Sequence, residues 1–125
     1  MKRWLVDGMN VVGSTPDGWW KDRRGAMRRL AAELAGFARA SGEEVTVVFD
    51  GSPFEVDTDG VEVRFAPRRG RNAADDEIAR LVGADSDPSG ITVVTSDREL
   101  AERVQADGAQ VEPARRFLNT IRSVS

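Results

Sequence analysis

Short, unbroken apolar runs recur along the chain, and each ends at polar turn residues. The clearest runs cover residues 4–6, 44–49 and 91–95, and weaker ones cover 61–65 and 109–111. Unbroken apolar runs of this length are typical of parallel strands that are buried on both faces. The pattern therefore predicts a mostly parallel sheet of about five strands.

The segments between these runs carry apolar residues at helical spacing. They predict helices over residues 21–40, 74–83, 97–106 and 113–121, the last with proline in its first turn. Strands that alternate with helices indicate an α/β fold with helices flanking the sheet. A chain of 125 residues without repeats or linkers is expected to form one domain over residues 1–125.

The composition narrows the chemistry that this fold can carry. The chain has no histidine and no cysteine, which excludes histidine-based acid–base catalysis, thiol nucleophiles and zinc sites built from those residues. An enzyme of this composition is expected to work through its aspartates and glutamates. Clusters of such carboxylates recruit hard divalent cations.

The net charge and the hydropathy of the chain limit the kinds of partner it can have. Eighteen basic residues face 21 acidic ones, for a formal net charge of −3, so contact with a nucleic acid requires a local positive surface. No apolar run approaches 18 residues, and the N-terminus leads directly into a predicted strand. We therefore expect no membrane span and a cytoplasmic protein.

Aspartates follow the three clearest apolar runs. Asp7, Asp50 and Asp97 stand where those runs end, and Asp75 opens the second predicted helix. In open parallel sheets, binding sites form outside the carboxyl ends of the strands, so these carboxylates are expected to meet at one edge. The alternative is ordinary local chemistry, since Asp-Gly is common in turns and aspartates are favoured in the first turn of a helix.

Helical phase separates the two neighbouring aspartates of the second predicted helix. Asp75 lies three residues before Ile78, on the apolar stripe, and a carboxylate there must be paired or bound to a metal. Asp76 lies four residues before Arg80 and is expected to form an exposed ion pair with it. We therefore favour Asp75 over Asp76 as a site residue.

Two polar positions near these aspartates have alternative roles. Ser96 with Glu99 matches a capping box, which would leave Asp97 free; if Asp97 caps the helix instead, it is less available as a ligand. The Asn10 amide is expected either to hold a carboxylate or phosphate oxygen or to cap a tight turn at Gly8.

Arginines and tryptophans supply candidate contacts to a nucleic acid. Arginine offers planar donors suited to phosphates, and tryptophan stacks on unpaired bases. The alternatives are a solvated charged face and aromatic packing, and one of the two tryptophans is expected in the core. The candidates are Arg68, Arg69, Arg71, Arg24, Arg28, Trp19 and Trp20.

Four stretches resemble, in the same order, the landmarks of one nuclease family. They are residues 6–13 (VDGMNVVG), 47–50 (VVFD), 74–78 (ADDEI) and 94–97 (VTSD). They are similar to motifs of the YacP-like branch of the NYN domains, within the PIN-like nuclease superfamily. The resemblance covers about residues 2–117.

The resemblance implies a Rossmann-like three-layer fold and metal-dependent endonucleolytic cleavage of RNA. By position it makes Asp7, Asp75 and Asp97 the catalytic residues and the ligands of Mg²⁺ or Mn²⁺. It gives supporting roles to Asn10, Asp50, Asp76 and Ser96. Some bacterial members act on translated messages at the ribosome, which makes the ribosome a conceivable partner. The alternative function is a non-catalytic RNA-binding or adaptor module of the same fold.

Overall fold

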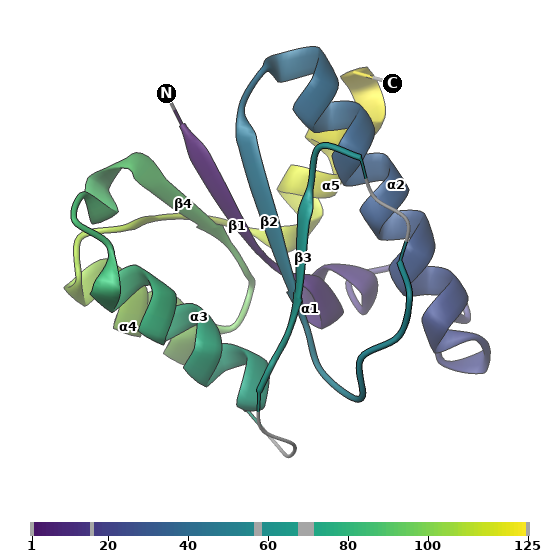
Figure 1. Ribbon diagram of the computed structural model, residues 1–125, viewed down its shortest axis with the longest axis horizontal. Helices are drawn as coiled ribbons and strands as arrows, with labels where there is room; N and C mark the ends of the chain where they lie inside the picture. Colours follow the sequence, from purple (N-terminus) through teal and green to yellow (C-terminus); the bar gives the residue numbers. More distant parts are fainter. Residues whose placement is uncertain (1, 16, 57–58, 68–71, 125) are drawn as a thin grey trace.

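A computed structural model describes residues 2–15, 17–56, 59–67 and 72–124. Its centre is one sheet of five parallel strands in the order β3-β2-β1-β4-β5, which confirms the predicted sheet (Figure 1). The strands are β1 (Arg3–Asp7), β2 (Glu44–Phe49), β3 (Glu62–Phe65), β4 (Ile91–Val94) and β5 (Gln110–Glu112).

All four predicted helices are present. The α-helices are α1 (Gly8–Val12), α2 (Arg23–Ser41), α3 (Ala73–Ala84), α4 (Arg98–Ala106) and α5 (Ala114–Val124). Two short 3₁₀ helices, η1 (Trp19–Lys21) and η2 (Pro88–Gly90), lie between them. The sequence predicted a turn in place of α1. Pro113 precedes α5 rather than lying in its first turn, and its carbonyl accepts a hydrogen bond from the Phe117 N–H.

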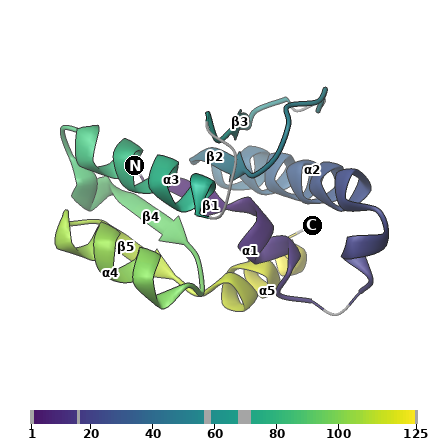
Figure 2. The same ribbon diagram turned by 90° about the horizontal axis from the view of Figure 1, so that it is seen from below.

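Two apolar clusters on opposite faces of the sheet make the fold a three-layer sandwich. Alternating side chains of β2 divide between them: Val47 and Phe49 pack with α1, α2 and α5, whereas Val48 packs with α3 and α4. Figure 1 shows α3 and α4 on one side of the strands and α2 and α5 on the other; Figure 2 gives the perpendicular view. Burial on both faces explains the unbroken apolar runs.

The junction between β1 and α1 requires glycine. A side chain at Gly8 would meet the ring of Phe49 and would lie 2.9 Å from the Val48 carbonyl oxygen. The close approach of the two backbones lets α1 begin directly after Asp7, the last residue of β1. Gly8 therefore fixes where the chain turns at the carboxyl edge of the sheet.

Gly8→Ala is expected to lower the free energy of unfolding by at least about 1–3 kcal/mol, because the added methyl group overpacks the junction. Urea denaturation checks this. Gly36→Ala is the matched control, since a methyl group there meets no atom within 4 Å in the middle of α2. That change is expected to stabilise the protein by about 0.5–1 kcal/mol. Equal effects of the two substitutions would contradict the steric argument.

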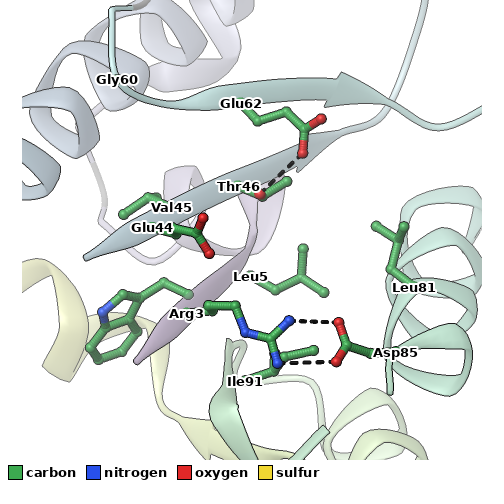
Figure 3. A pocket seen from close by; sticks show the side chains of 11 residues that line it. Arg3, Leu5, Glu44, Val45, Thr46, Gly60, Glu62, Leu81, Asp85 and Ile91 are labelled. Atoms are coloured by element: carbon green, nitrogen blue, oxygen red, sulfur yellow. Dashed lines mark hydrogen bonds and ion pairs between the residues drawn. The ribbon is translucent and has the colours of Figure 1, made fainter. Parts of the chain in front are cut away.

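A cavity of about 420 Å³ opens at the amino ends of the strands (Figure 3). An ion pair at its rim joins the start of β1 to the end of α3: Arg3 Nη1 lies 2.6 Å from Asp85 Oδ2. The cavity lies at the edge opposite the one where Asp7 ends β1, so it is separate from the predicted site. In the described part of the chain, no helix is long and apolar enough to span a membrane.

Candidate active site

Asp7 is a buried carboxylate at the carboxyl end of β1. It is 5% exposed, and its Oδ2 accepts a hydrogen bond of 3.0 Å from the Thr95 hydroxyl. The backbone N–H of Asn10 also donates to it. Burial raises the pKa of Asp7 to about 7; the two hydrogen bonds oppose this shift, and the charges of Asp75 and Asp50 add to it.

Asp75 lies half-buried in the first turn of α3. Burial raises its pKa to about 6, and the charges of Asp97 and Asp50 contribute to this shift. A proton on Asp75 would be shared in a hydrogen bond with the Asp97 side chain. Asp7 ends β1, and Asp50 and Asp97 follow the neighbouring strands β2 and β4, so these three aspartates lie at the carboxyl edge of the sheet; the hydrogen bond from Ala74 to Asp50 brings the start of α3, with Asp75, to the same edge.

Asp50 positions the helix that carries Asp75. It directly follows β2, and its Oδ1 accepts a hydrogen bond of 3.0 Å from the Ala74 N–H. The first N–H groups of a helix lack partners within the helix, so this contact caps α3 from a neighbouring strand. Asp50 therefore fixes the start of α3 against the carboxyl end of β2.

Asp97, not Ser96, caps α4. Its Oδ1 accepts hydrogen bonds from the N–H groups of Glu99, at 2.9 Å, and Leu100, at 3.2 Å. The capping-box alternative with Ser96 as the cap is therefore wrong. Both capping bonds use the same carboxylate oxygen, so the cap does not occupy Oδ2.

Ser96 and Asn10 connect the loop after β4 to two helices. The Ser96 hydroxyl accepts a hydrogen bond from the Ala114 N–H at 3.0 Å, at the start of α5. The Asn10 Oδ1 accepts one from the Ser96 N–H at 2.8 Å. The Asn10 side chain thus holds the backbone beside Asp97, while its backbone N–H supports Asp7.

Asp76 points toward α4. It forms an ion pair of 3.0 Å with Arg103, so the predicted pair with Arg80 is wrong. Arg80 instead binds Glu77, with Nε 2.8 Å from Oε1. The packing of α3 against α4 offers Asp76 a partner on another helix, which helical spacing alone does not reveal.

Sequence reasoning missed two residues at this edge. Thr95 is 1% exposed and connects two aspartates, because its hydroxyl donates to Asp7 and accepts from the Asp97 N–H at 3.1 Å. A hydroxyl at the end of a buried strand, two residues before an aspartate, was the available signal. Glu77 is 5% exposed and binds Arg80 and Arg64, and these contacts, Arg80 first, lower its pKa. Its place beside Ile78 on the apolar stripe was the signal.

Thr95→Val is expected to lower the free energy of unfolding by about 1–3 kcal/mol, because it removes one of the two hydrogen bonds to the buried Asp7 carboxyl and leaves the Asp97 N–H without the Thr95 hydroxyl. Urea denaturation near neutral pH measures this loss. Thr95→Ser keeps the hydroxyl and is expected to cost less. A valine variant as stable as wild type would contradict the argument, because valine keeps the methyl group and lacks only the hydroxyl that makes the two hydrogen bonds.

The described candidate contacts to RNA lie on η1 and α2 rather than at the carboxyl ends of the strands. The guanidinium groups of Arg24 and Arg28 lie over the Phe54 ring, at 4.8 and 4.9 Å from its centre. Trp19 is half-buried and packs against the core, as expected for one of the two tryptophans, whereas Trp20 is exposed. The remaining predicted contacts, Arg68, Arg69 and Arg71, lie outside the described residues.

The donor set at this edge is made of carboxylates, which suits hard divalent cations such as Mg²⁺ and Mn²⁺. Among the residues that the structure describes, no three acidic side chains come close enough together to hold an ion unaided. Mg²⁺ usually keeps several waters and binds through one or two carboxylates plus substrate phosphates. The neighbouring Asp75 and Asp97 side chains therefore fit an open site and not a closed cage.

The comparison with known families matches the YacP-like NYN domain over residues 4–125. The chain belongs to this family. Two crystal structures of Rae1 (YacP) from Bacillus subtilis are similar to this NYN domain. A tryptophan-to-leucine variant has 27% identity and a TM-score of 0.83, and the match covers 99% of this chain and 77% of that one. The second structure has 29% identity and a TM-score of 0.78, with 99% and 75% covered.

A comparison with curated proteins finds no match. The structural matches agree with the observed architecture, since they superpose nearly the whole parallel sheet and its flanking helices. Membership of this NYN family places the chain among nuclease-type domains.

Proposed function

We propose that this NYN domain is a metal-dependent endoribonuclease that hydrolyses phosphodiester bonds of RNA. The observation that carries the proposal is the meeting of four aspartates at the carboxyl edge of the sheet. Burial and mutual repulsion raise the pKa of Asp7 to about 7 and that of Asp75 to about 6. Carboxylates held in this way favour a cation, because a cation offsets charges that otherwise repel.

Asp75 and Asp97 would hold Mg²⁺ or Mn²⁺, together with Asp7, the third expected ligand, at the carboxyl end of β1. When bound, such an ion lowers the pKa of water and offsets charge on the phosphate, which supplies acid–base chemistry to a chain without histidine. Asp50 and Thr95 keep the carboxylates in place through the start of α3 and the loop after β4. Hydrolysis joins water to phosphorus and releases the 3′ oxygen with a proton, giving 5′-phosphate and 3′-hydroxyl ends.

RNA as the substrate is supported by local charge as well as by the family. Residues 20–29 hold five basic side chains and one acidic one, although the whole chain has a net charge of −3. Such local positive charge is what phosphate contact requires. Some bacterial members of the family that the sequence resembles act on translated messages at the ribosome. Messenger RNA on the ribosome is therefore the first natural substrate to test.

The test is cleavage of an end-labelled, unstructured RNA by the purified protein with Mn²⁺ or Mg²⁺, compared with the same reaction in EDTA. We expect internal cuts that need the metal and that leave 5′-phosphate and 3′-hydroxyl ends. Binding that weakens with salt, without any cutting of naked or ribosome-bound RNA, would favour the non-catalytic RNA-binding module instead.

A further inference from the structure

Trp20 is exposed to an unusual degree for a large aromatic side chain. It is 59% exposed. Among the described residues, it is the one large hydrophobic residue that is exposed rather than buried or half-buried. A single exposed apolar residue is common and by itself indicates nothing. Three further features of its surroundings indicate a binding role for Trp20.

The first feature is that Trp20 is held in place. Its ring meets the Trp19 ring edge-on, with centroids 6.1 Å apart and an interplanar angle of 85°. Trp19 in turn packs against the core. The backbone of η1 is closed by hydrogen bonds from Lys21 N–H to the Gly18 carbonyl, at 3.0 Å, and from Asp22 N–H to the Trp19 carbonyl, at 3.1 Å. A ligand that stacks on Trp20 therefore meets a surface that is largely ordered beforehand.

The second feature is the charge around it. Lys21, Arg23, Arg24, Arg28 and Arg29 follow Trp20 within nine residues and are all exposed. Asp22 is the acidic residue of this stretch, and its Oδ1 caps α2 by accepting the Gly25 N–H at 3.0 Å. An exposed aromatic ring on η1, directly before a helix that carries exposed cations, is a combination that suits single-stranded nucleic acid, through base stacking and phosphate attraction.

The third feature is continuity with the aspartates. Helix α1 begins after Asp7 and ends at Gly13, and the Trp19 ring lies 3.7 Å from the position of a side-chain carbon at Gly13. Five helical residues span roughly 7.5 Å, which is the length of about two stacked nucleotides at roughly 3.4 Å each. Helix α1 therefore links the carboxyl end of β1, where Asp7 lies, to the Trp19 ring against which Trp20 packs.

We propose that Trp20 is a base-stacking platform, so that this protein selects single-stranded RNA at a position a few nucleotides from the scissile phosphate. The inference rests on the proposed function for the identity of the RNA. It adds the structural class of the substrate and a residue that determines specificity. A base inside a duplex cannot stack on Trp20 unless the duplex opens, because both of its faces are already stacked on the neighbouring base pairs.

The test measures RNA affinity by fluorescence anisotropy in EDTA, where no metal-dependent cleavage occurs. The probes are a labelled short oligouridylate, which stays unpaired, and a hairpin of the same length. We compare wild type with Trp20→Ala, Trp20→Leu and Trp20→Phe. Leucine keeps apolar area without an aromatic face, whereas phenylalanine keeps the face. Circular dichroism checks that each variant is folded.

We expect wild type to prefer the oligouridylate to the hairpin. Trp20→Ala and Trp20→Leu should each weaken binding of the oligouridylate by at least about fivefold, and Trp20→Phe should retain most of it. Unchanged affinity in Trp20→Ala, equal affinity of the leucine variant and wild type, or equal binding of hairpin and oligouridylate by wild type would each overturn the proposal.

The outcomes also separate this inference from the proposed function. Protein that binds oligouridylate through Trp20 and never cleaves RNA would refute the nuclease and keep the stacking platform. Protein that cleaves RNA, with Trp20→Ala equal to wild type in both affinity and KM, would keep the nuclease and refute the platform.

Discussion

Asp75→Asn and Asp97→Asn are each expected to lower the rate of metal-dependent RNA cleavage by at least about 100-fold while the fold stays intact. Both substitutions remove a negative charge from the place where the proposed cation binds. The asparagine at position 97 can still accept the N–H groups of Glu99 and Leu100, so α4 keeps its cap. The Asp75→Asn change removes a half-buried charge that repels Asp97, so the metal-free protein should not lose stability.

Single-turnover cleavage with Mn²⁺ measures this effect, and calorimetry shows whether each variant still binds the ion. Asp107→Asn is the matched control, because Asp107 is exposed and lies at the opposite end of α4 from Asp97. It is expected to cleave as fast as wild type. Full activity in either Asp75→Asn or Asp97→Asn would refute the assignment of that residue.

The sequence predicted most of the fold because the sheet is buried on both faces. Each strand of the centre is then a short apolar run, and each long helix shows one apolar stripe. Helix α1 was missed for a physical reason. It has five residues, and its start at Gly8 depends on the close approach of the Phe49 ring, which is a contact from another strand.

The gathering of aspartates was predictable for the same reason, since the carboxyl ends of parallel strands share one edge. The roles of individual side chains were less accessible. Ser96 and Asp97 are both suited to cap a helix. Asp97 caps α4 because the Ser96 hydroxyl accepts a hydrogen bond from the Ala114 N–H instead. Asp76 likewise pairs with Arg103 because α4 packs beside α3, and no local pattern encodes that neighbour.

The metal-free protein is expected to lose stability as the pH rises, which is unusual for a folded chain. Asp7 and Asp75 have folded-state pKa values raised to about 7 and about 6 from an ordinary value of 3.8. At pH values between the ordinary pKa of an aspartate and these raised pKa values, the folded state binds more protons than the unfolded state. The free energy of unfolding therefore falls as the pH rises. The chain has no histidine, so few other side chains titrate in this interval.

From about pH 5 to about pH 8 we expect a loss of about 2–4 kcal/mol, most of it from the buried Asp7 and a smaller part from the half-buried Asp75. Urea denaturation in EDTA at the two pH values measures it. Asp7→Asn should remove most of the slope and be more stable than wild type at the higher pH, whereas Asp107→Asn should keep the wild-type slope. If the free energy of unfolding instead rises over this pH interval in EDTA, ionisation of Asp7 does not destabilise the folded state. The argument that the four aspartates favour a cation would then fail.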